Sequence, residues 1–124
     1  MARLLAVCLL VLSLPGCSLF RGMPPQDFFV LFFNPSTSQL APEAQQIVRQ
    51  AAANARTLRA TQIVIAIPAN TPGGMQLVEG RRTAVENILS AAGTDPKLFS
   101  RVPLTAAGPA PQGALDRAEI RLVH

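Results

Sequence analysis

The hydrophobic pattern of the first half of the chain predicts a strand, a helix and a second strand. Residues 27–33, DFFVLFF, are rich in aromatic and branched side chains and are typical of a buried strand. From residue 40 to residue 58 apolar side chains recur every three or four positions, which predicts an amphipathic helix that begins near Pro42. Residues 62–67, QIVIAI, predict a second strand that is buried on both faces.

The second half of the pattern predicts a further helix and two more strands. The helix should begin near Met75 and end at Gly93, with apolar residues at positions 77, 84, 85, 88, 89 and 92. Residues 97–103 predict a short strand, and the Pro/Gly/Ala-rich residues 106–114 predict a loop. Residues 118–123, AEIRLV, alternate between apolar and charged side chains and predict a half-buried final strand.

These elements alternate in the order β-α-β-α-β-β, and no repeat period is visible. We therefore expect one α+β domain at residues 27–124, a sandwich in which two helices pack on a small mixed sheet. Any crossover between parallel strands should be right-handed. A domain of this size is only marginally stable, because small domains bury a limited share of their surface.

The N-terminal residues resemble a bacterial lipoprotein signal. One cation, Arg3, precedes an apolar run at residues 4–12, which is too short to span a bilayer as a helix of about 20 residues. The motif Leu-Pro-Gly-Cys that ends at Cys17 resembles a lipobox. This implies a signal peptide at residues 1–16, acylation of Cys17 and a lipidated tether at residues 17–26. The alternative is an ordinary secretory signal with a chance cysteine.

A protein with acyl chains on Cys17 and so short a tether would lie close to its membrane. Ser18 follows the cysteine. A residue other than Asp at this position resembles the pattern of enterobacterial lipoproteins that are exported to the outer membrane. We therefore expect the periplasmic face of the outer membrane. The other cysteine, Cys8, falls within the predicted signal, so the mature domain has no disulfide or cysteine-based metal site.

The charge of the chain gives little support to a nucleic-acid partner. The formal net charge is +4, but the basic residues are scattered and the only adjacent pair is Arg81–Arg82. There is no Trp or Tyr for stacking on bases. A solvated basic surface facing a polyanionic envelope is the simpler interpretation.

Arg81 interrupts the apolar stripe of the second predicted helix, because it lies four residues from both Leu77 and Val85. A guanidinium is rarely buried without a partner, and three interpretations stay open. Arg81 reaches water with its stem packed, or pairs with a carboxylate or carbonyls of the protein, or binds an anionic ligand at the mouth of a site. Its neighbour Arg82 should form a surface ion pair with Glu79.

Three segments resemble the OmpA-like peptidoglycan-binding domain, in the order in which that family has them. Residues 32–45, FFNPSTSQLAPEAQ, resemble its opening strand, loop and Leu-x-Pro-Glu-Ala helix start. Residues 77–85, LVEGRRTAV, keep the Leu, Arg and Val of its helix signature Leu-Ser-x-x-Arg-Ala-x-x-Val. Residues 116–122, DRAEIRL, resemble the closing strand Asn-Arg-Arg-Val-Glu-Ile. The resemblance covers residues 27–124.

The resemblance implies non-covalent binding of the peptidoglycan stem, with diaminopimelate as the group that is gripped. The helix Arg of the family, here Arg81, takes the ligand's carboxylate, and an Asp in a Gly-His-Thr-Asp motif takes its ammonium. That motif is replaced by Pro-Ala-Asn-Thr, so Asn70 and Thr71 are the candidate site residues there, and Asn34 and Ser36 stand at neutralised acidic positions of the first loop. Exchanging Asp for Asn should weaken binding by about 1–2 kcal/mol.

Nothing in the sequence indicates an enzyme, a cofactor or a metal site. His124 is the only histidine and the terminal residue, which argues against a triad or a metal centre. The Gly73-Gly74 pair lacks the Lys-Ser/Thr of a phosphate-binding loop, and the seven carboxylates are dispersed.

Two functions therefore stay open. The first is an outer-membrane lipoprotein whose OmpA-like domain binds peptidoglycan and tethers the envelope to the cell wall. The second is a degenerate OmpA-like lipoprotein without ligand binding, which serves as a structural or protein-interaction subunit of an envelope complex. A carboxylate that reaches the loop at residues 68–74 in space, such as Glu79 or Asp116, favours the first. An uncharged loop with Arg81 paired internally favours the second.

Overall fold

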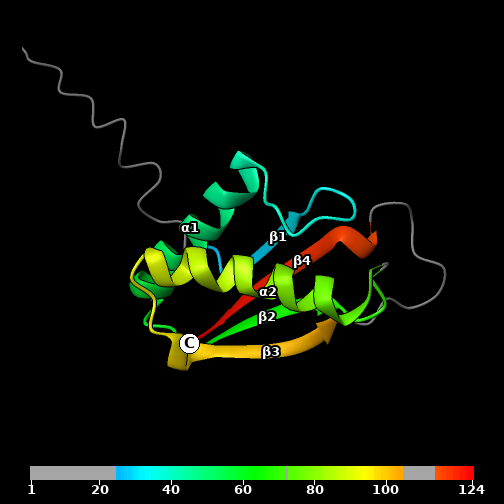
Figure 1. Cartoon of the computed structure of the whole chain (residues 1–124). Coiled ribbons are helices and arrows are strands. Elements are labelled where there is room, and N and C mark those ends of the chain that lie inside the picture. Colours follow the sequence, from blue (N-terminus) through cyan, green and yellow to red (C-terminus); the bar gives the residue numbers. More distant parts are fainter. Residues whose placement is uncertain (1–24, 72, 105–113) are drawn as a thin grey trace, which may run out of the picture.

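The computed structural model describes residues 25–71, 73–104 and 114–124. Its helices and strands are β1 (Phe28–Phe32), α1 (Pro42–Leu58), β2 (Gln62–Pro68), α2 (Gly74–Ala91), β3 (Phe99–Leu104) and β4 (Arg117–Val123). Figure 1 shows two layers, a twisted sheet and the pair of helices that pack on it. The predicted α+β class and element order are confirmed. The predicted signal peptide and most of the predicted tether and of the loop at 106–114 lie outside the described residues.

The last strand in the sequence lies inside the sheet. The strand order is β1-β4-β2-β3, with β4 antiparallel to both of its neighbours and β2 parallel to β3. A parallel pair needs a crossover, and α2 supplies it. The entry of β4 lies beside the end of β1, where the backbone N–H of Phe33 donates to the carbonyl of Asp116 at 2.8 Å. This arrangement brings residues from both ends of the domain to one place.

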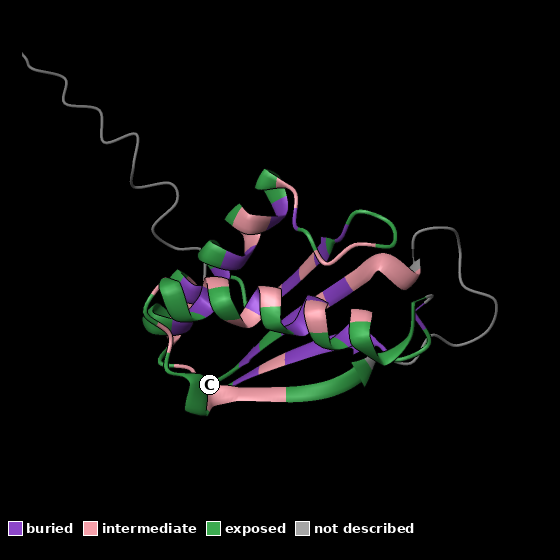
Figure 2. Cartoon of the chain, viewed as in Figure 1, coloured by how far each residue is buried: buried purple, intermediate pink, exposed green. Residues whose placement is uncertain are grey.

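The core lies between the sheet and the helices (Figure 2). Small side chains on the buried side of α1 allow its backbone to approach the sheet closely: Ala44, Val48, Ala51, Ala52 and Ala55. The sheet contributes larger side chains that are less than 2% exposed, namely Leu31, Ile63, Ile65, Ile67 and Ile120. Each such side chain stabilises the fold by about 1.5–3 kcal/mol.

The buried side of α2 differs from the prediction. Val78, which is 2% exposed, begins the buried stripe in place of the partly exposed Leu77. The stripe continues through Arg81, Arg82, Val85 and Leu89, again at intervals of three and four. Two positions of this buried stripe are arginines. The pattern of hydrophobic residues therefore predicted a different stripe, which begins at Leu77.

The prediction that β2 is buried on both faces was wrong for Val64, which is partly exposed. Ile63, Ile65 and Ile67 face the helices and are fully buried. The opposite face of the sheet is not covered by any described helix. No helix among the described residues is long and apolar enough to cross a membrane.

Candidate functional site

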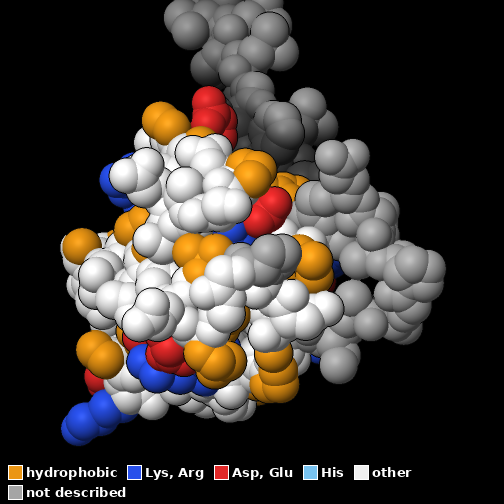
Figure 3. Space-filling model, turned by 45° about the vertical axis from the view of Figure 1, so that its right-hand side comes forward, with side chains coloured by type: hydrophobic (Ala, Val, Ile, Leu, Met, Phe, Trp, Pro, Cys, Tyr) orange, Lys and Arg blue, Asp and Glu red, His pale blue; other side chains and the backbone are white. Residues whose placement is uncertain are grey.

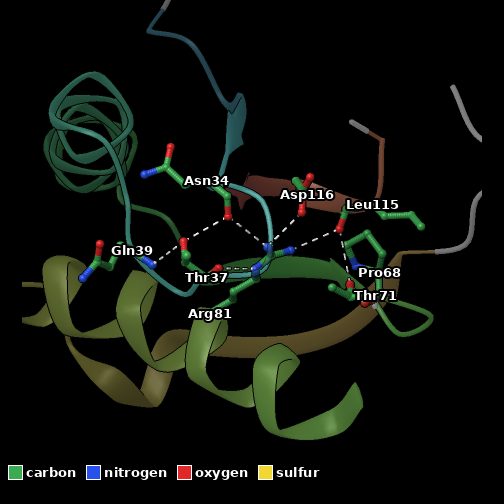
Figure 4. A network of polar contacts seen from close by, with 8 residues as sticks. All are labelled: Asn34, Thr37, Gln39, Pro68, Thr71, Arg81, Leu115 and Asp116. Atoms are coloured by element: carbon green, nitrogen blue, oxygen red, sulfur yellow. Dashed lines mark hydrogen bonds and ion pairs between the residues drawn. The ribbon is translucent and has the colours of Figure 1, made fainter. Parts of the chain in front are cut away.

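Arg81 is the largest fully buried side chain in the part of the chain that the structure describes. It lies in the first half of α2, and its side chain has 0% exposure. The helical spacing from Val78 to Val85 directs it into the space between α2, the end of β1 and the entry of β4 (Figure 4). The interpretation in which Arg81 reaches water is therefore excluded.

The guanidinium of Arg81 is held by the protein itself. Nε donates to the carbonyl of Thr37 at 2.8 Å, and Nη1 donates to the carbonyl of Leu115 at 3.2 Å. Nη2 donates to the carbonyl of Asn34 at 3.3 Å and to Oδ1 of Asp116 at 2.9 Å. Four of the five N–H groups of the arginine thus have protein acceptors. This confirms the interpretation in which Arg81 pairs with a carboxylate and with carbonyls.

An aromatic ring completes the environment of Arg81. The guanidinium carbon lies 4.9 Å from the centroid of the Phe33 ring, within the range of a cation–π contact. Phe33 is 4% exposed, so the contact is shielded from water. Arg81 therefore connects α2 with the end of β1, with the β1–α1 loop and with the residues that precede β4.

Thr71 is part of the same network. Its hydroxyl donates to the carbonyl of Pro68 at 2.6 Å and lies 3.3 Å from the carbonyl of Leu115, which Arg81 also contacts. Thr71 is 4% exposed. The hydroxyl therefore connects the β2–α2 loop to the end of β2 and to the segment before β4 (Figure 4).

The two predicted asparagines lie differently. Asn34 meets Arg81, but through its backbone carbonyl, and the residue is exposed. Asn70 is exposed in the turn after β2, and its side chain forms no hydrogen bond within the described residues. The structure thus brings together Asn34, Thr71 and Arg81 and leaves Asn70 at the surface.

A pocket of about 420 Å³ opens between the β1–α1 loop and the start of α2. It is lined by Ser36, Gly73, Gln76 and Leu77, and none of these carries a charge. Ser36 has φ 61° and Gly73 has φ 111°, so both loops turn sharply where they meet the pocket. The first turn of α2 has no acidic residue and no side-chain cap. The N–H of Gly74 donates to the carbonyl of Thr71 at 3.2 Å, so the N–H groups after it in this turn are the ones that can meet a ligand.

Several charged side chains of α2 and β3 pair with one another. In the view of Figure 3, acidic and basic side chains lie beside one another near the centre and near the bottom, whereas an acidic side chain at the top and a basic one at the upper left lie apart. Arg82 pairs with Glu79 at 3.5 Å, as predicted, but Arg82 is buried and not at the surface. Arg101 of β3 pairs with Glu86 of α2 at 3.0 Å. The hydrogen bond that Arg101 donates to the Glu86 carboxylate raises the pKa of Arg101, a group that is charged at any physiological pH.

Comparisons with known proteins identify the fold. No protein-family model matches the sequence, and no curated protein matches it. The peptidoglycan-associated lipoprotein from Burkholderia pseudomallei has a TM-score of 0.62 at 18% identity, over 75% of this chain and 88% of that one. The OmpA-like domain of FopA1 from Francisella tularensis has a TM-score of 0.62 at 12% identity, over 77% and 73%. The chain has the OmpA-like fold.

A third structure with this fold is the cell wall anchor of the T6SS from Pseudomonas aeruginosa, with a TM-score of 0.54 at 17% identity over 78% and 82% of the two chains. The three segments that resemble the OmpA-like domain, residues 32–45, 77–85 and 116–122, meet at Arg81. Asp116 directly precedes Arg117, the first residue that this chain shares with the closing signature, and supplies the counter-charge.

The sequence pointed to Asp116 only as one of two acids that would favour peptidoglycan binding if they lay near the loop at residues 68–74. It did not find Phe33 or the carbonyls of Thr37 and Leu115 as partners of Arg81. Backbone carbonyls leave no trace in residue types, and their position follows only from the conformation of two loops. The sequence did contain one useful signal, which is the position of Asp116 directly before the closing strand β4. This strand pairs with β1, and the pairing brings Asp116 to the end of β1.

Proposed function

We propose that this chain is an outer-membrane lipoprotein whose OmpA-like domain contacts peptidoglycan and holds the envelope to the cell wall. The fold is similar to that of a peptidoglycan-associated lipoprotein and of a cell wall anchor. The lipobox-like motif at Cys17 supports an acyl anchor, and Ser18 supports sorting to the outer membrane. The role is one of binding, not of catalysis.

The pocket at the start of α2 carries this proposal. It lies between Ser36 of the first loop and Gly73 of the second, and these are the two loops that the resemblance associates with the ligand. Gln76 and the uncapped first turn of α2 offer neutral donors to the carboxylates of a stem peptide. The exposed amides of Asn34 and Asn70 lie in the same two loops and are proposed as further contacts.

Arg81 has a supporting role in this proposal. Its N–H groups already serve three carbonyls and Asp116, so a ligand carboxylate would have to displace partners that the protein holds in place. Neutral hydrogen bonds contribute about 1 kcal/mol, against about 1.5–3 kcal/mol for charged ones. Binding through the neutral pocket is therefore weak, and an anchored protein offsets this by its high local concentration at the wall.

Co-sedimentation with purified sacculi tests the proposal. The full chain in detergent micelles should pellet with sacculi, and Gln76→Trp, which fills the pocket, should abolish most of the pelleting. Met75→Trp is the matched control, because Met75 is 63% exposed and does not line the pocket. Equal pelleting of the two variants would contradict binding at this pocket.

The second candidate is a structural or protein-interaction subunit of an envelope complex. The internal pairing of Arg81 and the absence of charge among the residues that line the described pocket favour it. Under this role the wild-type chain stays in the supernatant when sacculi are pelleted, at low and at high salt. The same experiment therefore separates the two candidates.

The lipid anchor has its own test. Metabolic labelling with a radioactive fatty acid should mark the wild-type chain and not Cys17→Ser. The wild-type protein should also fractionate with outer membranes. Labelling of Cys17→Ser, or a soluble wild-type protein, would contradict the lipid anchor. Neither result would bear on ligand binding at the pocket.

A further inference from the structure

The open face of the sheet carries a regular pattern of side chains. Phe29 and Leu31 of β1 are buried beneath the helices, so the alternation of a strand turns Phe28, Val30 and Phe32 to the opposite face. The register of the sheet turns Arg117, Glu119, Arg121 and Val123 of β4, Val64 and Ala66 of β2, and Ser100 and Val102 of β3 to that same face.

This face is unusually apolar for exposed surface. The described residues include four exposed large hydrophobic side chains, and Phe32, Val102 and Val123 on this face are 55%, 38% and 38% exposed. A groove of about 430 Å³ runs over it and is lined by Phe28, Val64, Ala66 and Val102 together with Glu119 and Arg121. An apolar face of this kind marks an interaction surface.

Charges run along the middle of the face with alternating sign. Arg117, Glu119 and Arg121 follow one another on β4, and apolar residues of β1 and β2 flank them on both sides. Glu119 pairs with Arg117. Arg121 forms no ion pair within the described residues, and its guanidinium lies 5.4 Å from the Phe28 ring centroid. The stripe therefore leaves one cation without a carboxylate partner from the described part of the chain.

Two neighbouring rows across the sheet complement each other. The first row is Phe28, Arg121, Val64 and Ser100, and the second is Val30, Glu119, Ala66 and Val102. On each strand, the residue of the first row and the residue of the second row differ in charge or in size. Arg121 and Glu119 have opposite charges, and the residues on the other three strands differ in size. This is the relation that two packed layers need in order to interdigitate.

We propose that this face binds the same face of a second copy of the chain, around a two-fold axis that lies across the strands between the levels of residues 119 and 121. The axis places Arg121 opposite Glu119 of the second copy, and Glu119 opposite its Arg121. Phe28 then faces Val30 of the second copy, and Val64 faces its Ala66. Each contact occurs twice, as an interface between identical surfaces requires.

The dimensions of the face set the strength of the dimer. Four strands about 4.8 Å apart and about five residues long give a face of roughly 19 by 17 Å. Such a face is small beside stable interfaces, which bury about 800 Å² on each partner. We therefore expect a weak and reversible dimer.

Charge exchange at residues 119 and 121 tests the proposal. The full chain in density-matched detergent, followed by sedimentation equilibrium, should dimerise in the micromolar range. Glu119→Arg and Arg121→Glu should each weaken the dimer at least about tenfold, because like charges then face each other. The double variant Glu119→Arg/Arg121→Glu should recover most of the affinity. A monomeric wild type, unchanged single variants or a double variant without recovery would overturn the proposal.

A second pair of variants keeps the test independent of folding. Val102→Asp places a charge on the apolar part of the face and should dissociate the dimer, whereas Gln46→Asp on the exposed side of α1 should not. Far-UV circular dichroism verifies that each variant is folded. If the face docked on an anionic bilayer instead, Arg121→Glu would weaken and Glu119→Arg would strengthen binding to phosphatidylglycerol vesicles. That result would also overturn the proposal.

Discussion

Arg81 of α2 and Asp116 at the entry of β4 form an ion pair with an Nη2–Oδ1 distance of 2.9 Å, in which the guanidinium is fully buried and the carboxylate side chain is 21% exposed. The pair is asymmetric, because only one of its charges has left water. Three backbone carbonyls complete the environment of the buried charge. The hydrogen bonds offset the desolvation of the arginine, so its removal should cost more than the loss of one ion pair.

Replacement of Arg81 should be strongly destabilising. Arg81→Ala removes the hydrogen bonds to three carbonyls and to Asp116 and leaves a cavity in place of a fully buried side chain, so it should lower the free energy of unfolding by about 3–5 kcal/mol. Arg81→Lys keeps the charge but not the planar fork, and should fall between Ala and wild type. Urea denaturation followed by circular dichroism measures the effect.

The matched control for this prediction is Arg49→Ala. Arg49 is exposed on α1, and its one side-chain hydrogen bond within the described residues is to Gln45 at 3.4 Å, so its loss should change the free energy of unfolding by less than about 0.5 kcal/mol. If Arg81→Ala were as stable as Arg49→Ala, the arginine would be held far less firmly than its contacts indicate.

Asp116→Asn tests the counter-charge alone. The amide keeps an oxygen that can accept from Nη2, but the buried guanidinium loses its opposite charge, so we expect a loss of about 1–3 kcal/mol. Glu119→Gln removes a carboxylate from the more exposed pair with Arg117 and should cost less than about 1 kcal/mol. Thermal unfolding of both variants provides the comparison, and a larger loss for Glu119→Gln would contradict it.

The sequence predicted the elements well where one strong period dominated. Residues 40–58 follow a single helical period, and the helix begins at the predicted Pro42. The prediction failed where polar residues occupy buried places, because Arg81 and Arg82 conceal the stripe that begins at Val78. It also could not separate a strand buried on one face from one buried on both, since isoleucine and valine suit either.

The candidate site was predicted as a set of residues and not as a geometry. The spacing of Arg81 on an apolar face correctly indicated a special environment for its charge. Whether its partner came from a ligand or from the protein depended on the entry of β4, which is far away in the sequence and is brought near by strand pairing. Long-range pairing of this kind has no local signal.

The two glycines before α2 should respond differently to alanine. Gly73 has φ 111°, and a Cβ built on it would lie 2.9 Å from Cδ2 of Leu77. Gly74 has φ 76°, and a Cβ there would meet nothing within 4 Å. Both variants carry backbone strain of about 1–2 kcal/mol, and Gly73→Ala adds a steric clash.

Gly73→Ala should therefore be the less stable variant in urea denaturation. It should also reduce any binding at the pocket that Gly73 and Leu77 line, whereas Gly74→Ala should retain it. Equal losses of stability would show that Leu77 moves aside without cost.

Thr71→Val should separate the hydroxyl from the shape of the side chain. Valine fills the same buried volume but leaves the carbonyls of Pro68 and Leu115 without this donor, so we expect a loss of about 1–3 kcal/mol. Thr71→Ser keeps the donor and should retain most of the stability. Amide hydrogen exchange in the β2–α2 loop should rise in Thr71→Val and stay near the wild-type rate in Thr71→Ser. The opposite order would assign the stability to the methyl group.

The position of β1 has a mechanical consequence for the proposed attachment. The predicted tether enters at Phe28, and the pocket lies beyond the opposite end of the same strand, next to Ser36. The hydrogen bonds between β1 and β4 run across the strands, so tension along β1 shears all five paired positions together and cannot open them one at a time. A domain of modest thermodynamic stability can thus withstand a force between membrane and wall, because the force is distributed over all the hydrogen bonds between β1 and β4.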